Sequence, residues 1–402
     1  MLLENYNRAP LTVVAGEGCE LIDDTGRRYL DLVGGIAVCA LGHAHPAIAD
    51  AVAAQARTLV HVSNLYGHEP AGTLANELSY RSGFERVFFC NSGTEANEAA
   101  IKLARKFAYR TGNKQRNVIL SCTGGFHGRT MGALAATANT AYHDGFAPLP
   151  AGFRTTPFND VAALQDAIDE NVAAFIVEPV QGESGVFCAS PEFLKAAREL
   201  CSQRGALLIF DEVQCGMGRV GPLFAFQAYG VTPDVVTLAK ALANGLPIGA
   251  MLVREQFAAG LKPGDHGSTF GGSPVPCAAA LAHLRVRDET HLEHHVAAIS
   301  GELFRGLNDL AMRYPHIYGE PRGMGLLVGL PVLPPHDAAD IVNDLREHAS
   351  ILVNKAGNNT IRLVPPLILT ASQVERMLDA FSMAAESRAA TAPLAAGYPS
   401  AH

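Results

Sequence analysis

The chain has 402 residues, of which 48% are hydrophobic and only 17% are charged, with a formal net charge of −8. This length predicts two or three subdomains, and the scarcity of charge predicts a large subunit interface. The negative balance, without a basic stripe, argues against binding to nucleic acid.

The cysteines and the apolar runs indicate the cellular compartment in which the protein is expected. The 8 cysteines are scattered and form no CxxC pair, which is typical of a reducing environment. The first residues lack the apolar core of a secretion signal, and no apolar run approaches the roughly 18 residues of a membrane span. We therefore expect a soluble, cytoplasmic protein without membrane partners.

The N-terminal part predicts strands followed by a helix. Residues 11–33 read as a strand hairpin around a turn at Asp24-Thr25-Gly26. Pro46 occupies a position suited to the first turn of a helix, which we expect to end near Arg57.

From about residue 75 to 255, apolar strands alternate with helical patterns. Helices are expected at Thr94–Tyr109 and Pro191–Arg204. Continuous apolar strands joined by helices indicate a parallel sheet that is covered on both faces. The expected strands are Val87–Cys90, Val118–Cys122, Ala173–Val177, Leu207–Phe210, Val235–Leu238 and Ala250–Val253.

The last third of the chain no longer shows the alternation of apolar strands and helices. A long amphipathic helix is predicted by an apolar stripe of Leu292, Val296, Ile299, Leu303, Leu307 and Leu310. Short strands are expected at Leu326–Leu330, Ile351–Asn354 and Thr360–Val364, before a last helix with a capping box at Thr370 and Gln373. We expect a large domain over residues 51–285, a smaller α+β domain from residues 1–50 and 286–390, and a flexible tail over 391–402.

Two reactive side chains follow neighbouring strands. Asp211 closes one predicted strand and Lys240 follows the next, so both are expected at one edge of the sheet, where ligands of open α/β sheets bind. An amine that forms a Schiff base and an acid that keeps a ring nitrogen protonated suit pyridoxal phosphate. Taken singly, either residue also suits an ordinary strand end: a loop-capping Asp or a Lys that reaches solvent.

Other motifs follow strands in the same way. Ser92, Gly93 and Thr94 open a helix and suit a phosphate, although an ordinary capped helix has the same pattern. Phe126 and Arg129 offer an aromatic ring and a guanidinium. A loop over 266–272 is rich in glycine and hydroxyls. The GxGxxG pattern over 216–221 lacks the following acid of a dinucleotide site, and the histidines over 291–295 lack metal-binding spacing, so no metal is expected.

With these motifs in order, the chain resembles the class III pyridoxal-phosphate aminotransferases from about Gly16 to Leu367. The resemblance implies an α/β chain of pyridoxal-phosphate transferase fold type I, with a mostly parallel central sheet in the large domain. It also implies a homodimer with shared active sites. The most specific stretches are NSGTEANEAAIKLAR from Asn91, VEPVQGESG from Val177 and FDEVQCGMGR from Phe210, together with Phe126–Arg129, Lys240–Ala250 and His266–Gly272.

The resemblance assigns a role to each matching residue. Lys240 is implied to bind the cofactor covalently and to move protons, and Asp211 to hold the ring nitrogen. The other implied cofactor contacts are Val213 and Phe126 on the two ring faces, Gln214 at the phenolic oxygen, Ser92, Gly93 and Thr94 at the phosphate, and Thr269 of the partner subunit, also at the phosphate.

The implied substrates are N-acetylornithine and the pair 2-oxoglutarate and glutamate, in a ping-pong reaction. Arg129 and Ser268 are the implied contacts of acetylornithine, and Arg362 that of the glutamate α-carboxylate. Glu183 is implied to cover Arg362 for the first substrate and to swing away for the second. Ser184, beside it, stands where relatives usually carry glycine.

Several alternatives stay open from the sequence. Succinylornithine, succinyl-diaminopimelate, ornithine and 4-aminobutyrate suit the same machinery. A catalytically silent pyridoxal-phosphate-binding protein is a second class, and a dinucleotide oxidoreductase, resting only on the glycine pattern, is a third.

Overall fold

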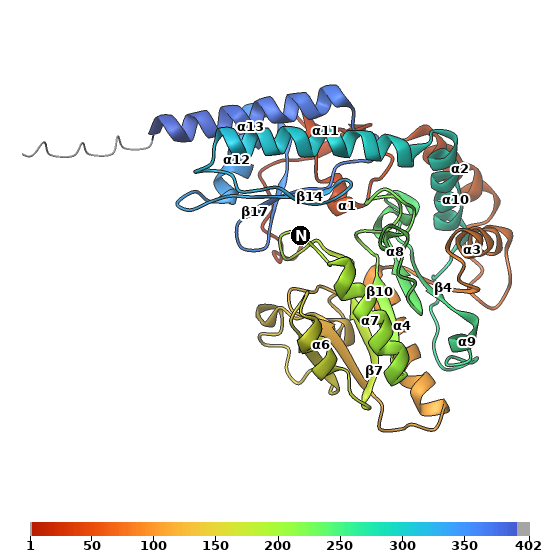
Figure 1. The fold of residues 1–402 in the computed structure, drawn as a ribbon. Coiled ribbons are helices and arrows are strands. Elements are labelled where there is room, and N and C mark those ends of the chain that lie inside the picture. Colours follow the sequence, from red (N-terminus) through yellow and green to blue (C-terminus); the bar gives the residue numbers. More distant parts are fainter. Residues whose placement is uncertain (1, 392–402) are drawn as a thin grey trace, which may run out of the picture.

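The computed structural model describes residues 2–391. Within them, a seven-stranded sheet forms the centre of the larger lobe, in the lower part of Figure 1. In spatial order its strands are β4 (Arg86–Cys90), β12 (Gly249–Val253), β11 (Val235–Leu238), β10 (Leu207–Asp211), β7 (Val172–Val177), β5 (Val118–Cys122) and β6 (Phe153–Thr156).

The sheet is mixed in direction. Strands β11, β10, β7, β5 and β6 run parallel to one another, and the apolar runs predicted this direction for the first four. The expectation of a parallel partner was wrong for β12, which runs antiparallel to both β11 and β4. A buried apolar run reads the same in either direction, so the pattern carries no sign of this reversal. Strand β6 was not predicted.

Alternate strand residues feed two apolar clusters on opposite faces. Ile209 and Met251 pack with α4 (Gly93–Arg110), whereas Phe210 and Leu252 belong to the larger cluster with α7 (Pro191–Arg204). On the larger cluster's side, α10 (Pro274–Glu289) packs on α2 (Pro46–Thr58) and α3 (Glu69–Ser82). The larger lobe also contains α5 (Met131–Ala136), α6 (Val161–Ala167), α8 (Ala225–Tyr229), α9 (Glu255–Ala258) and the 3-10 turns Thr140–Tyr142 and Lys240–Ala243.

The smaller lobe combines both ends of the chain. The N-terminal hairpin pairs with a C-terminal strand, since β3 (Arg28–Asp31) runs parallel to β15 (Ile351–Leu352). Helices α11 (Leu292–Arg313), α12 (Ala338–Ala349) and α13 (Ala371–Thr391) lie along this lobe at the top of Figure 1. The other elements are β1 (Val13–Glu17), β2 (Glu20–Asp23), α1 (Gly34–Ala37), β13 (Arg322–Met324), β14 (Leu327–Pro331), β16 (Asn354–Ala356) and β17 (Thr360–Leu363), with the small hairpin β8 (Val180–Gln181) and β9 (Phe187–Cys188) in the chain between β7 and α7.

Two predicted features of these helices are confirmed. The whole apolar stripe of α11 is buried. The capping box forms at the start of α13, where the Thr370 N–H donates to Gln373 Oε1 at 3.0 Å and the Gln373 N–H donates to Thr370 Oγ1 at 3.3 Å. The predicted tail lies outside the described residues, apart from Thr391, which α13 includes. Among residues 2–391, no helix is both long and apolar enough to cross a membrane.

Candidate active site

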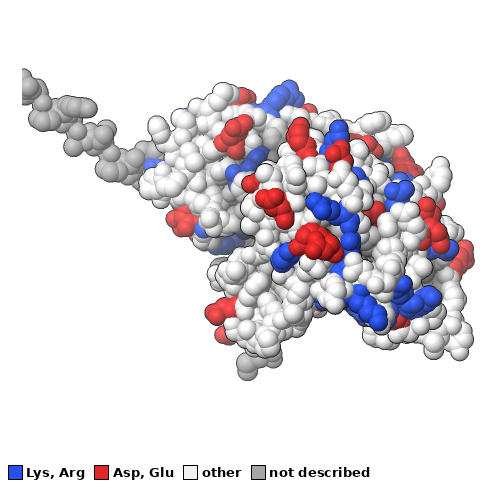
Figure 2. Space-filling view, turned by 60° about the horizontal axis from the view of Figure 1, so that its bottom comes forward, with Lys and Arg blue, Asp and Glu red and all other residues white. Residues whose placement is uncertain are grey.

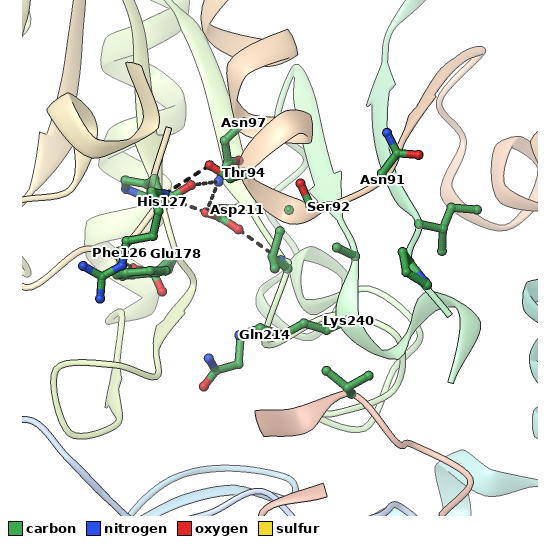
Figure 3. A pocket seen from close by; sticks show the side chains of 18 of the residues that line it. Asn91, Ser92, Thr94, Asn97, Phe126, His127, Glu178, Asp211, Gln214 and Lys240 are labelled. Atoms are coloured by element: carbon green, nitrogen blue, oxygen red, sulfur yellow. Dashed lines mark hydrogen bonds and ion pairs between the residues drawn. The ribbon is translucent and has the colours of Figure 1, made fainter. Parts of the chain in front are cut away.

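One cavity of about 410 Å³ lies at the edge of the sheet where β4, β5, β10 and β11 end (Figure 3). Both Asp211 and Lys240 line it. The motifs that follow separate strands are therefore brought to a single site. Its walls also contain Asn91, Ser92, Gly93, Thr94, Asn97, Phe126, His127, Gly128, Arg129, Glu178, Val213, Gln214 and residues 245–248.

Asp211 is held in one orientation by three donors. Its Oδ2 accepts hydrogen bonds from Asn97 Nδ2 at 2.7 Å and from His127 Nδ1, placed as donor, at 2.8 Å, while its Oδ1 accepts the Val213 N–H at 3.1 Å. Asn97 is itself fixed, because the Thr237 hydroxyl donates to its Oδ1 at 2.7 Å. With only 3% of its surface exposed, the carboxylate is ordered before any ligand arrives.

Lys240 lies across the cavity from this network (Figure 3). It begins the 3-10 turn after β11 with a positive φ of 44°, which is uncommon for a residue other than glycine. Desolvation lowers the pKa of Lys240, and the positive charge of Arg362 lowers it further, against the opposing effect of Glu183. A larger share of the amine is therefore neutral and able to act as a nucleophile or a base.

The N-terminus of α4 opens on the same cavity. Ser92 caps the helix, since its Oγ accepts the Glu95 N–H at 3.3 Å and donates to Glu95 Oε2 at 2.8 Å. A Cβ on Gly93 would lie 2.6 Å from a methyl group of Val213, so only glycine fits there. The first N–H groups of a helix have no partner within it, and they suit an anion such as a phosphate.

Phe126 and Arg129 form another wall. The Phe126 N–H donates to Glu178 Oε2 at 2.8 Å, and the Arg129 guanidinium lies over the rings of Tyr142, at 3.9 Å, and Phe126, at 5.4 Å. Burial raises the pKa of Glu178 well above its ordinary value, and the nearby charge of Asp211 raises it further. Burial thus favours the neutral form of Glu178 at the cavity wall, and the Arg129 guanidinium packs against aromatic rings.

Glu183 and Arg362 form an ion pair beside the cavity. Arg362 Nη1 donates to Glu183 Oε1 at 2.6 Å, to Gln214 Oε1 at 3.2 Å and to the Gly182 carbonyl at 3.2 Å. Gln214 Nε2 donates to Glu183 Oε1 at 3.1 Å, so its amide joins the pair. Burial by itself raises the pKa of Glu183, but the charges of Arg362 and Lys240 outweigh it and hold the pKa below its ordinary value.

The loop over residues 266–272 does not reach the cavity of its own chain. Ser268 Oγ accepts Asn91 Nδ2 at 3.2 Å and the Gly271 N–H at 2.9 Å. Thr269 lies in a separate depression with His61 and His68. Four of the residues singled out from the sequence are thus absent from the cavity walls: Glu183 and Arg362 lie beside the cavity, Ser268 contacts it through Asn91, and Thr269 lies apart from it.

The GxGxxG segment is packed against the smaller lobe. Arg219, in its middle, is fully buried, and its Nη1 donates to the carbonyl oxygen of Leu326 at 3.0 Å. The segment leads only to the five-residue helix α8. It does not form the turn into a long helix that a dinucleotide site requires.

Three residues of the site were missed from the sequence: Asn97, His127 and Glu178. Asn97 carried a usable signal, because a polar residue stands at a helix position whose neighbours Ala96 and Ala100 are apolar. His127 and Glu178 carried no such signal, since each follows a strand end like any loop residue.

The donor set fits pyridoxal phosphate. A buried, oriented carboxylate suits the ring N–H, a lysine of lowered pKa suits the aldehyde, and a helix N-terminus with a glycine suits the phosphate. These groups line one cavity, as a single ligand requires.

Comparison with known proteins agrees with this chemistry. A family model described as "Aminotransferase class-III" matches residues 2–385. The acetylornithine aminotransferase of Methanocaldococcus jannaschii is 46% identical over 378 residues, which cover 94% of this chain and 94% of that protein.

Solved structures with the same fold include two related enzymes. The ornithine aminotransferase from Toxoplasma gondii ME49 superposes with a TM-score of 0.93 at 33% identity, covering 97% of this chain and 93% of that one. The N-acetylornithine aminotransferase from Stenotrophomonas maltophilia K279a superposes with a TM-score of 0.84 at 37% identity, covering 96% and 98%. The chain therefore belongs to the class III aminotransferases, which depend on pyridoxal phosphate and share the α/β architecture of fold type I.

Proposed function

We propose that the protein transfers the δ-amino group of N2-acetyl-L-ornithine to 2-oxoglutarate, giving N-acetyl-L-glutamate 5-semialdehyde and L-glutamate, as a step of arginine biosynthesis in the cytoplasm. The observation that carries the proposal is the ion pair of Glu183 with Arg362 beside Lys240. The name of the Methanocaldococcus jannaschii relative supports the substrate.

Asp211 and Lys240 have different roles in the proposed reaction. Pyridoxal phosphate, when bound, supplies an electrophilic carbon that accepts the amino group and a ring that withdraws electrons from the bond that breaks. Asp211, oriented by Asn97 and His127, holds the ring nitrogen protonated. Lys240 takes the proton from the amine-bearing carbon of the substrate and returns it at the next step.

The Glu183–Arg362 pair allows one site to serve two substrates. While Glu183 neutralises Arg362, the arginine does not attract the donor's carboxylate, so the donor enters with its ω-amine toward Lys240. Glutamate needs a free Arg362 for its α-carboxylate, so Glu183 must turn away. The two half-reactions then alternate in a ping-pong cycle.

Arg129 supports an acylated donor. Its guanidinium is held over two aromatic rings at the cavity wall and can bind the donor's α-carboxylate. An acylated α-amine is neutral and needs no anionic partner there. We place Ser268 beside the acyl group and Thr269 at the phosphate, both supplied by a partner subunit, since neither reaches the cavity of its own chain.

A homodimer follows from that assignment. Thr269 is followed in the chain by Phe270, which is 62% exposed, and the segment that contacts its loop carries Leu65, 85% exposed, and Tyr66, 72% exposed. Asn64, next to them, ties this segment to the loop by donating to the Ser268 carbonyl at 2.9 Å. The apolar side chains and the loop suit one self-complementary interface that delivers Thr269 to the partner's site.

A substrate panel tests the assignment. We expect kcat/KM for N-acetylornithine to exceed that for ornithine, succinylornithine, succinyl-diaminopimelate and 4-aminobutyrate, with 2-oxoglutarate as acceptor. Equal values for acetylornithine and ornithine would defeat the specific assignment. The Lys240→Ala variant is the control, in which transamination of every donor is lost.

A further inference from the structure

Glu183 lies in a tight hairpin loop whose backbone is strained. Residues 182–186 connect β8 to β9, which pair antiparallel. Gly185 has a φ of 115° and Val186 a φ of 62°. A positive φ costs about 1 to 3 kcal/mol for a β-branched residue, so the loop keeps this shape only if other groups hold it.

Arg322, from β13 of the smaller lobe, supplies those contacts. Its Nε donates to the carbonyl oxygens of Gly185 and Val186, both at 3.0 Å, and its Nη2 donates to Gly185 O at 2.8 Å and to Thr360 Oγ1 at 3.0 Å. The guanidinium also lies 4.0 Å from the centre of the Phe187 ring. Throughout residues 2–391, no carboxylate forms an ion pair with Arg322, so its charge is directed at the loop.

The other side of the loop is fixed as well. The Gly357 N–H donates to the Glu183 carbonyl at 2.9 Å, and a Cβ on Gly357 would clash with the Ser184 carbonyl. Ser184 Oγ donates to Gln181 Oε1 at 3.2 Å. With the backbone held on both sides, Glu183 can leave Arg362 only by rotating its side chain.

We propose that Arg322 is a positioning residue for Glu183: it holds the loop so that the carboxylate faces Arg362, and it thereby sets the preference of the site between ω-amino donors and glutamate. This inference rests on the proposed use of one site by two substrates. Without the contacts of Arg322, Glu183 covers Arg362 less of the time. The ω-amino donor then meets an Arg362 that Glu183 no longer neutralises, whereas Arg362 is available to bind the α-carboxylate of glutamate.

The test compares Arg322→Gln and Arg322→Lys with Arg105→Gln. Arg105 is a matched control, because it likewise donates to backbone carbonyls, those of Asn117 and Ala151, and lies over a phenylalanine ring, Phe153, far along α4. Each half-reaction is followed alone by single-turnover absorbance of the holoenzyme, once with acetylornithine and once with glutamate.

We expect Arg322→Gln to slow the acetylornithine half-reaction about 10- to 100-fold and the glutamate half-reaction by less than about threefold. Arg322→Lys should fall between Arg322→Gln and the wild type, and Arg105→Gln should leave the ratio of the two rates unchanged. In a Glu183→Gln background, Arg322→Gln should no longer change the ratio, because the residue acts through Glu183. Equal slowing of both half-reactions, or the same change of ratio in Arg105→Gln, overturns the inference.

The wild-type enzyme separates this inference from the proposed function. If it prefers another ω-amine to acetylornithine, the proposed substrate is wrong and the comparison is made with that amine. If it accepts glutamate but no ω-amine, both proposals fail.

Discussion

Asp211 illustrates how much of the candidate site depends on residues that hold another side chain in place. Its carboxylate is buried, and three donors from three separate segments hold it. Asn97 is the central one, because it binds Asp211, the His127 carbonyl and the Thr237 hydroxyl at 2.7 Å each. Removing it would leave buried polar groups without partners.

Asn97→Ala should therefore affect both stability and activity. We expect the free energy of unfolding to fall by about 2 kcal/mol, since the Thr237 hydroxyl loses its acceptor. Because Asp211 also loses a charge-assisted bond, we expect kcat/KM to fall about 10- to 100-fold. Urea unfolding and steady-state kinetics measure the two effects. The control is Asn308→Ala, at an exposed position of α11, where the amide bonds only its own helix; similar losses in both variants would contradict the prediction.

The sequence pointed to Lys240 and Asp211 but not to the residues that hold them in place. Lys240 and Asp211 lie where apolar runs end, so each can be recognised in the sequence as a charged residue at the end of a strand. His127 and Glu178 acquire their surroundings from distant segments, and no local pattern shows that burial raises the pKa of Glu178. Tertiary contacts decide such properties.

At the scale of elements, α10 contains a buried titratable group. His283 is fully buried, and its Nδ1 lies 3.4 Å from the Leu242 carbonyl. Burial lowers the pKa of His283 to about 4. The helix therefore packs around a neutral imidazole, whereas the unfolded chain takes up a proton at a pH near 6.5.

This difference predicts a pH dependence of stability. Between pH 6.5 and 4 the unfolded chain binds more protons than the folded one, so stability falls as the pH falls. The contribution of His283 should reach about 3 kcal/mol at the acid end. His283→Leu should unfold with a flatter pH profile in denaturant titrations, whereas His348→Gln, at an exposed position of α12, should keep the wild-type profile. Parallel profiles for wild type and His283→Leu would refute this.

Elements were predicted where their pattern is strong. The bounds of β5, β11 and α7 are those expected, because each is a buried run or a periodic stretch with clear ends. Strand β6, Phe-Arg-Thr-Thr, was missed since it lies at the sheet edge with its middle residues exposed. An edge strand needs no apolar run.

At the scale of the whole molecule, the surface is sparsely charged. Acidic and basic side chains are interspersed on the face in Figure 2, and wide uncharged areas lie between them. Thr269 and its exposed apolar neighbours are the part of the surface that we assign to a second copy of the chain.

Complementation between subunits tests that assignment. Thr269→Ala should lower the activity, and Lys240→Ala should abolish it. A mixed dimer of the two variants, isolated with two different affinity tags, should regain about half of the wild-type activity, because one of its two sites then has both intact residues. If Thr269 served its own chain, the mixed dimer would be no more active than the Thr269→Ala parent.

The reversed strand β12 has a consequence for engineering. Because it runs against β4 and β11, it starts where they end, and its first residue, Gly249, touches the turn that opens α4. A methyl group at Gly249 would overlap the Ser92 carbonyl, so glycine at this position is needed for the turn that opens α4 to keep its shape. Variant libraries designed to broaden the range of amine substrates should therefore keep glycine at position 249.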